Sequence, residues 1–366
     1  MRLRSWVIPF LMLLAAGCSA SSLSPTNGQP AKAPSLSTSP THASLPRLDT
    51  TGAASFLNYC RSLNAGVPWN VSELTQMVTT TGYQTLIAHH RRMDPAISTG
   101  ALVKMLAAIQ DGTQFTTESA RLDRIYRSYR AACNQTAVLV SLLEQWAQSD
   151  IIERAVAQAR PVLPSQARLQ ATVYLLPDGY SHAYVVEEHE AVVLDFLHPG
   201  LMDSERFLAH ELHHIGVRSL LPPPCQEAGW SEALEVLTSM VQEGAASYWI
   251  NGWRASPSPT DMEWVESFIR DTLSDRLSAD ETAPRREQLV WGRYGPVYQM
   301  GNIMIATLEQ EYGRDWVVSR LSDPVGLMLV WQDLAPPELK FNPGIFAMMQ
   351  AAGEGSECSL WLKSLQ

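Results

Sequence analysis

Hydrophobic residues recur at helical spacing over most of the chain. Apolar positions follow one another at intervals of three and four residues from about residue 50 to residue 163, most clearly in residues 138–152. The same spacing returns after Ser204 and continues to the end, broken by the prolines at 222–224 and the turn residues at 292–296. The pattern predicts a mainly helical protein.

Three short runs in the middle of the chain have the character of β-strands. Residues 173–176, 183–186 and 191–196 are rich in Val, Tyr and Leu, and a Pro-Asp-Gly-Tyr turn at 177–180 separates the first two. The chain shows no internal repeat and no second linker. These features predict one α+β domain, mostly helical, with a small three-stranded sheet.

The first residues have the composition of an export signal. Arg2 and Arg4 precede an apolar stretch at residues 6–16, which is too short to span a membrane but suits a secretory signal. The stretch ends in Leu-Ala-Ala-Gly-Cys, which resembles the bacterial lipobox, whose cysteine (here Cys18) is lipidated. The resemblance implies a signal peptide at residues 1–17. An ordinary signal peptide cut near Ala20, with Cys18 lost, is the alternative.

The segment that follows is expected to be a tether. Residues 18–46 consist largely of Ser, Thr, Pro, Ala and Gly, which cannot bury enough surface to fold, so the folded domain is expected over residues 47–366. The lipobox resemblance implies a membrane partner through the lipid anchor and a place in the bacterial cell envelope. By the same resemblance, Ser19 implies the outer membrane where the cell has one.

Composition and charge exclude several classes of protein. The formal charge of −10 differs from the basic surface of nucleic-acid binders, so no nucleic-acid partner is expected. The absence of an apolar run of about 18 residues excludes a protein with several membrane spans. The 11 Trp, 11 Tyr and 8 Phe need burial, which excludes a wholly disordered chain.

Four cysteines remain if Cys18 carries lipid, and an even number permits two disulfides in an exported protein. We expect Cys60 to pair with Cys133 and Cys225 with Cys358; four unpaired buried thiols are the alternative. No two cysteines have the CxxC spacing, so cysteine-based metal or redox chemistry is not expected.

The clearest chemical signal is the segment His-Glu-Leu-His-His at residues 210–214. A helix projects His210 and His214 from one face, at the spacing at which two imidazole nitrogens bind one Zn²⁺. Glu211 lies beside them, where its carboxylate can take a proton from a zinc-bound water. His213 faces away, as a supporting or surface residue. This HExxH arrangement predicts one zinc ion per chain; a helix whose histidines make ordinary contacts is the alternative.

A third protein ligand is needed if one zinc position is to stay open for water. The prolines at 222–224 turn the chain, and a second helix is expected from Ser231 to about Ile250. Glu232 and Glu235 lie in its first turns, where acids complement the helix dipole. Glu243 is mid-helix, where a packed carboxylate needs a partner. Glu243 is therefore preferred over Glu235 and Glu232, and the small residues at 244–246 are expected to bring this helix close to the first.

Residues 210–214 followed by Gln-Glu-Gly-Ala-Ala at 242–246 resemble a gluzincin-type metallopeptidase. The chain is more narrowly similar to zinc-dependent peptidases of uncharacterised bacterial families, the DUF5700 and DUF2268 type. Residues 80–83, 177–180 and 298–301 support the resemblance through their order. It implies a zincin-like fold, zinc and hydrolysis, and a Glu-Gly-x-Ala segment whose Glu (here Glu243) is the third ligand.

The resemblance also implies roles for further residues. Gluzincins use a Tyr or His donor to stabilise the oxyanion, and Tyr298 is the preferred candidate, with Tyr294 next; a plain core aromatic is the alternative for both. Asp195 is a candidate to orient a ligand histidine, or else a turn residue. The strand at 180–186 is the candidate to pair with an extended substrate. The cluster at 89–92 is interpreted as a solvated helix end.

These observations predict a membrane-anchored, zinc-dependent hydrolase, specifically a peptidase that acts on peptide or protein substrates. Zinc is expected on His210, His214 and Glu243, with Glu211 as general base. A non-catalytic envelope protein that uses the fold as a binding or scaffold module is the alternative. A purely structural zinc, closed by His213 or Cys225, is a further one.

Overall fold

A computed structural model describes residues 45–197, 201–223, 225, 229–290, 295–353 and 361, without the side chains of residues 187, 201–203, 279, 352 and 353. The predicted signal peptide, Cys18 and almost all of the predicted tether lie outside these residues. Tyr294 and Cys358 also lie outside them. No helix among the described residues combines the length and the apolar character needed to cross a bilayer.

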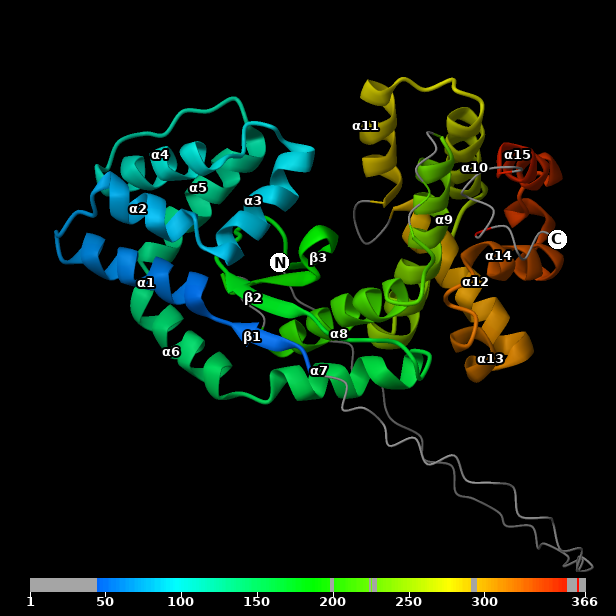
Figure 1. Cartoon of the computed structure of the whole chain (residues 1–366), viewed down its shortest axis with the longest axis horizontal. Helices are drawn as coiled ribbons and strands as arrows, with labels where there is room; N and C mark the ends of the chain where they lie inside the picture. Colours follow the sequence, from blue (N-terminus) through cyan, green and yellow to red (C-terminus); the bar gives the residue numbers. More distant parts are fainter. Residues whose placement is uncertain are drawn as a thin grey trace, which may run out of the picture. The chain divides into compact units, whose positions relative to one another are not determined.

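The described strands form one sheet in the order β1-β2-β4-β3 (Figure 1). β1 (Arg47–Asp49) runs parallel to β2 (Thr172–Leu176), β2 runs parallel to β4 (Ala191–Asp195), and β3 (Ala183–Val186) pairs antiparallel with β4. The three predicted strands are present, and the α+β, mostly helical fold class is confirmed. The predicted number of strands was wrong because β1 has only three residues, too few to show an alternating pattern.

The sheet is covered by helices because its two central strands, β2 and β4, are mainly apolar and buried on both faces. Every residue of β4 is buried. Gly52 and Gly82 belong to α1 (Thr51–Asn64) and α3 (Thr81–Met93), and a Cβ atom at either position would touch Leu176, so both helices lie on the same side of β2. α8 (Leu201–Arg218) contacts β3 and β4 and lies between the sheet and the C-terminal helices (Figure 1).

The N-terminal region is helical as predicted. Its remaining helices are α2 (Val71–Val78), α4 (Thr99–Gln110), α5 (Ala120–Cys133), α6 (Thr136–Gln148) and α7 (Ile151–Ala159). Cys60 of α1 forms a disulfide with Cys133 at the end of α5, so this predicted pair is confirmed. The other predicted pair includes Cys358, outside the described residues.

The interpretation of residues 89–92 as a solvated helix end is wrong for His90. Its ring is fully buried, and its Nε2 lies 3.0 Å from Oδ1 of the equally buried Asp178. Arg121 places Nη1 3.1 Å from Nδ1 of the same ring. The partner carboxylate belongs to the turn between β2 and β3, 88 residues further along the chain. A local run of polar residues cannot indicate such a partner.

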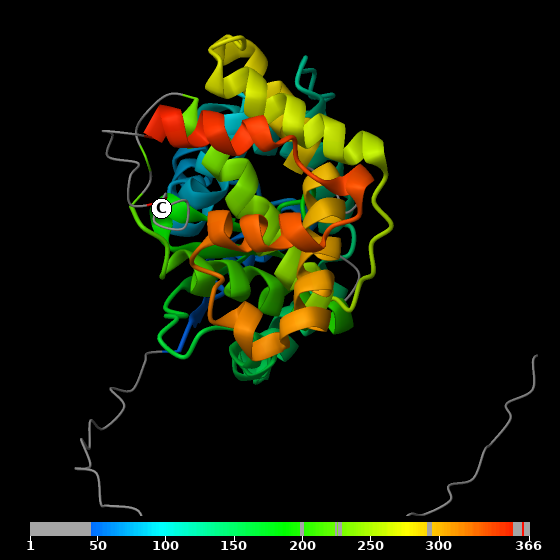
Figure 2. The same ribbon diagram turned by 90° about the vertical axis from the view of Figure 1, so that its right-hand side faces the viewer.

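The C-terminal helices gather around α9 (Figure 2). α9 (Trp230–Ala245) continues into a π-helical turn, Ala246–Ile250, so a single helical rod covers the predicted second helix. The helices that follow are α10 (Pro259–Leu273), α11 (Ala279–Val290), α12 (Pro296–Tyr312), α13 (Arg314–Val318), α14 (Pro324–Leu334) and α15 (Pro343–Gly353).

Residues 244–246 make a close helix contact, as predicted, and their tightest neighbour is α12. A Cβ atom on Gly244 would lie 2.3 Å from the carbonyl carbon of Gly301 in α12, so the two backbones touch. α9 packs more extensively on α12 than on α8. The predicted approach to α8 is also present, because α8 contacts both α9 and the π-helical turn that begins at Ala246. The tighter contact with α12 was not predicted.

Candidate metal centre

α8 presents two histidines to one point. His210 and His214 lie one turn apart with ring centroids separated by 4.6 Å, and both are buried. The helix is fixed in this orientation because Leu208 and Leu212 are fully buried in the core.

Glu243 reaches the same point from α9. Its Oε2 lies 3.1 Å from Nε2 of His210 and 3.2 Å from Nε2 of His214. One ligand atom from each of the three residues lies within 4.8 Å of the others, and we call this group the His-His-Glu cluster. Glu232 and Glu235 instead contact Arg286, each at 2.7 Å.

The cluster is held together electrostatically. Burial opposes the ionisation of Glu243, yet the charge of His214 and the hydrogen bonds to both histidines hold its pKa well below the usual range. Burial would lower the pKa of His214, but the charge and hydrogen bond of Glu243 raise it. The arrangement thus favours an ionised carboxylate facing two imidazoles.

Glu211 lies between the cluster and the edge strand β3. Burial raises its pKa more than the nearby His210 and His214 lower it. The backbone amide of Val185 in β3 interacts with its carboxylate. Glu211 therefore adjoins both the cluster and the outermost described strand on that side of the sheet.

Tyr298 comes to the cluster from the first turn of α12. Its hydroxyl interacts with the Glu243 carboxylate, and burial together with that negative charge raises its pKa well above the usual value. The phenol therefore stays protonated and can donate a hydrogen bond.

Asn251 is a neighbour of the cluster that sequence reasoning missed. It follows the π-helical turn, and its Nδ2 lies 3.0 Å from Nδ1 of His210. Its Oδ1 is buried without a hydrogen-bond partner. An asparagine that ends a helix is common, so nothing in the sequence distinguished this one.

Asp195 has a different role from the orienting one considered for it. Its carboxylate accepts hydrogen bonds from the backbone amides of Asp178, Gly179 and Leu197, so it shapes the turn between β2 and β3. His213 is fully buried rather than on the surface. Burial and the charges of His214 and His210 hold its pKa well below the usual range, so it stays neutral.

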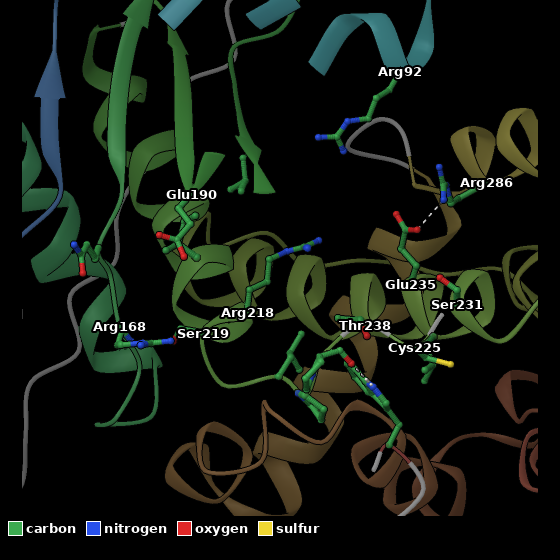
Figure 3. A pocket seen from close by; sticks show the side chains of 18 residues that line it. Arg92, Arg168, Glu190, Arg218, Ser219, Cys225, Ser231, Glu235, Thr238 and Arg286 are labelled. Carbon is green, nitrogen blue, oxygen red and sulfur yellow. Dashed lines mark hydrogen bonds and ion pairs between the residues drawn. The ribbon is translucent and has the colours of Figure 1, made fainter. Parts of the chain in front are cut away.

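A cleft of about 810 Å³ adjoins this region (Figure 3). Its lining includes Val185 of β3, Ile215 and Arg218 of α8, and Leu234 and Thr238 of α9. Val185 is thus shared between the cleft and the surroundings of Glu211, and Ile215 directly follows His214 in α8.

Comparison with known families gives a match over most of the chain. Residues 74–337 match the model of a family described as "Putative zinc dependent peptidase (DUF5700)". The match spans more than half of the chain and includes every residue of the His-His-Glu cluster. No curated protein and no solved structure matches the chain.

Proposed function

The chain belongs to the DUF5700 family, and on that premise we propose that it is a zinc metallopeptidase whose metal is held by His210, His214 and Glu243. The observation that carries the proposal is that two imidazole Nε2 atoms of α8 and one carboxylate of α9 converge at a buried point. Glu211 is proposed as general base and Tyr298 as the oxyanion donor.

The donor set fits zinc. Two imidazole nitrogens and one carboxylate are a combination that catalytic zinc sites use, with one position left for water. Zinc-bound histidines typically donate their other ring N–H to a fixed acceptor. If the Asn251 amide were turned over, its unpartnered Oδ1 would accept a hydrogen bond from the N–H of Nδ1 of His210. The lone pair of Nε2 would then be free to bind the metal.

Zinc bound in this cluster would acidify a coordinated water and polarise the scissile carbonyl. The raised pKa of Glu211 suits a carboxylate that takes the proton of the attacking water and passes it to the leaving nitrogen. The protonated Tyr298 would donate a hydrogen bond to the oxygen on which negative charge develops. β3 is the edge strand of the described sheet, and its backbone groups other than the Val185 amide, which contacts Glu211, could pair with an extended peptide.

The test is the metal content of the purified protein. Wild type is expected to hold about one zinc per chain, and His210→Ala and Glu243→Ala are expected to lose it. Glu235→Ala is the matched control, because Glu235 lies on the same helix but contacts Arg286. A wild-type protein without zinc after dialysis against the metal, or equal loss in the control, would refute the assignment.

We also propose that Cys18 anchors the protein to the bacterial envelope, on the strength of the lipobox resemblance alone. Metabolic labelling with a palmitate analogue should mark the wild type and leave Cys18→Ala unlabelled. Label in both proteins would refute the anchor without affecting the zinc proposal.

A further inference from the structure

The cleft beside the His-His-Glu cluster has an unusual charge for this chain. The whole protein carries a formal charge of −10, yet four arginines and two glutamates line the cleft. The arginines come from separate parts of the chain: Arg92 from α3, Arg168 from the segment before β2, Arg218 from α8 and Arg286 from α11. Figure 3 shows Arg92 and Arg218 extending into the space from different elements.

The arginines differ in how far their charge is compensated. Arg286 contacts both Glu232 and Glu235, so its positive charge is neutralised within the protein. Arg92 pairs with the exposed Glu188, and its own side chain is 46% exposed, so solvent reaches this pair. Arg168 is exposed as well. Arg92 and Arg168 therefore place two solvent-accessible guanidinium groups at the cleft, beside the exposed Glu190 of the same lining.

Arg218 connects this charge to the candidate metal centre. It lies four residues after His214, one turn further along α8, and it lines the cleft. A ligand that meets Arg218 in the cleft therefore contacts α8 one turn beyond His214, although the cluster itself does not line the cleft.

We propose that this cleft binds a carboxylate of the peptide substrate, with Arg92, Arg168 and Arg218 as its cationic partners. The guanidinium group suits a carboxylate because it can donate two parallel hydrogen bonds. The carboxylate belongs either to an Asp or Glu side chain or to a free C-terminus, since both present the same chemistry. The inference rests on the proposed function, because it assigns a substrate class to that same site.

The experiment measures, by fluorescence anisotropy, peptide binding to the full-length Glu211→Gln variant, which removes the proposed general base, with and without added zinc. Four labelled short peptides of one parent sequence are compared, with Glu or Gln inside the chain and with a free or amidated C-terminus. The Glu/Gln pair and the free/amidated pair separate the two sources. At least one of the two carboxylates should lower the dissociation constant about tenfold. This difference should shrink as the salt concentration rises.

Substitutions then locate the binding. Arg92→Gln and Arg218→Gln, each added to Glu211→Gln, should bring the affinity ratio of the acidic and neutral peptides toward one. Arg127→Gln is the matched control, because Arg127 is an exposed arginine of α5 that pairs with Asp123 and does not line the cleft. It should keep the full ratio. Two cleft variants are used so that a folding defect in one does not decide the result.

The outcomes separate this inference from the proposed function. Equal affinity for all four peptides, or a ratio unchanged by both cleft variants, overturns the carboxylate site even if wild type hydrolyses peptides. Selective binding that depends on the cleft arginines supports the site even if the zinc and hydrolysis assays fail. A ratio that falls equally in Arg127→Gln overturns the assignment to this cleft.

Discussion

The contact between Gly244 and Gly301 should control both stability and metal binding. In Gly244→Ala the new Cβ would lie 2.3 Å from the carbonyl carbon and 2.4 Å from the carbonyl oxygen of Gly301. Ordinary contacts begin near 3.4 Å, and both neighbouring atoms are backbone. Helices α9 and α12 must therefore separate by about 1 Å.

The cost can be estimated from this separation. Forcing extra volume into a packed interface costs about 1–3 kcal/mol, and alanine recovers up to about 1 kcal/mol through its better helix propensity. With the full gain from alanine, the net free energy of unfolding should fall by about 0–2 kcal/mol. Glu243 directly precedes Gly244, and Tyr298 lies one turn before Gly301, so the same movement displaces both side chains. Zinc affinity should fall at least about tenfold.

Urea denaturation and chelator competition measure the two effects. Gly100→Ala is the matched control, because Gly100 also lies in a helix but has no heavy atom within 4 Å of a new Cβ. It should raise stability by up to about 1 kcal/mol and leave zinc affinity unchanged. A Gly244→Ala protein as stable as Gly100→Ala, with wild-type zinc affinity, would refute the reasoning.

Four further predictions follow from the site and its surroundings. Glu211→Gln should retain zinc by metal analysis and lower kcat at least about 10²-fold; wild-type turnover would exclude Glu211 as general base. Tyr298→Phe should lower kcat about 10²-fold with zinc retained, whereas loss of zinc would mean that the hydroxyl supports the ligand carboxylate instead. Asn251→Ala should weaken zinc binding about tenfold in chelator competition, and Asn251→Asp, which restores an acceptor for His210, should recover it; equal loss in both would contradict the orienting role. Burial and the negative charge of Asp178 raise the pKa of Asp195 from 3.8 to about 7. The carboxyl group of Asp195 therefore binds its proton more tightly in the native state than in the unfolded chain. Protonation of Asp195 therefore contributes fully to the free energy of unfolding below about pH 4. This contribution is lost as the pH rises to about 7, by at most about 1.4 kcal/mol per pH unit. Urea denaturation of Asp195→Asn should show a flatter pH dependence than wild type over that range, and an unchanged slope would contradict this.

The sequence allowed the elements of the fold to be predicted where the pattern was long or flanked by turn residues. The helices before residue 163 and the strands around the 177–180 turn correspond to regular hydrophobic patterns. β1 was missed because it has only three residues, and its strand conformation depends on pairing with β2, about 125 residues away in the chain.

The candidate site was predictable only in part, for a physical reason. The spacing of His210 and His214 is set by the helix itself, so their proximity followed from the sequence. Glu243 was selected by the argument that a mid-helix carboxylate on a packed face needs a partner. Asn251 was missed because its position depends on a π-helical turn, which has no reliable sequence signal.

Interactions between distant segments were the least predictable. The burial of His90 depends on Asp178 and Arg121, which are remote in sequence. The cationic cleft likewise collects arginines from α3, α8 and α11. In both places the function of a charged residue depends on neighbours that only the folded chain supplies.

The order of the strands has a consequence for how the domain could be held. Residues that precede Arg47 join the domain at β1, whereas the proposed substrate strand β3 lies at the other margin of the sheet. Two strands separate these margins, a distance of about 14 Å. Tension applied through the N-terminus would act first on the β1–β2 pair, so a domain attached there could pivot while its opposite margin remained open to an arriving polypeptide.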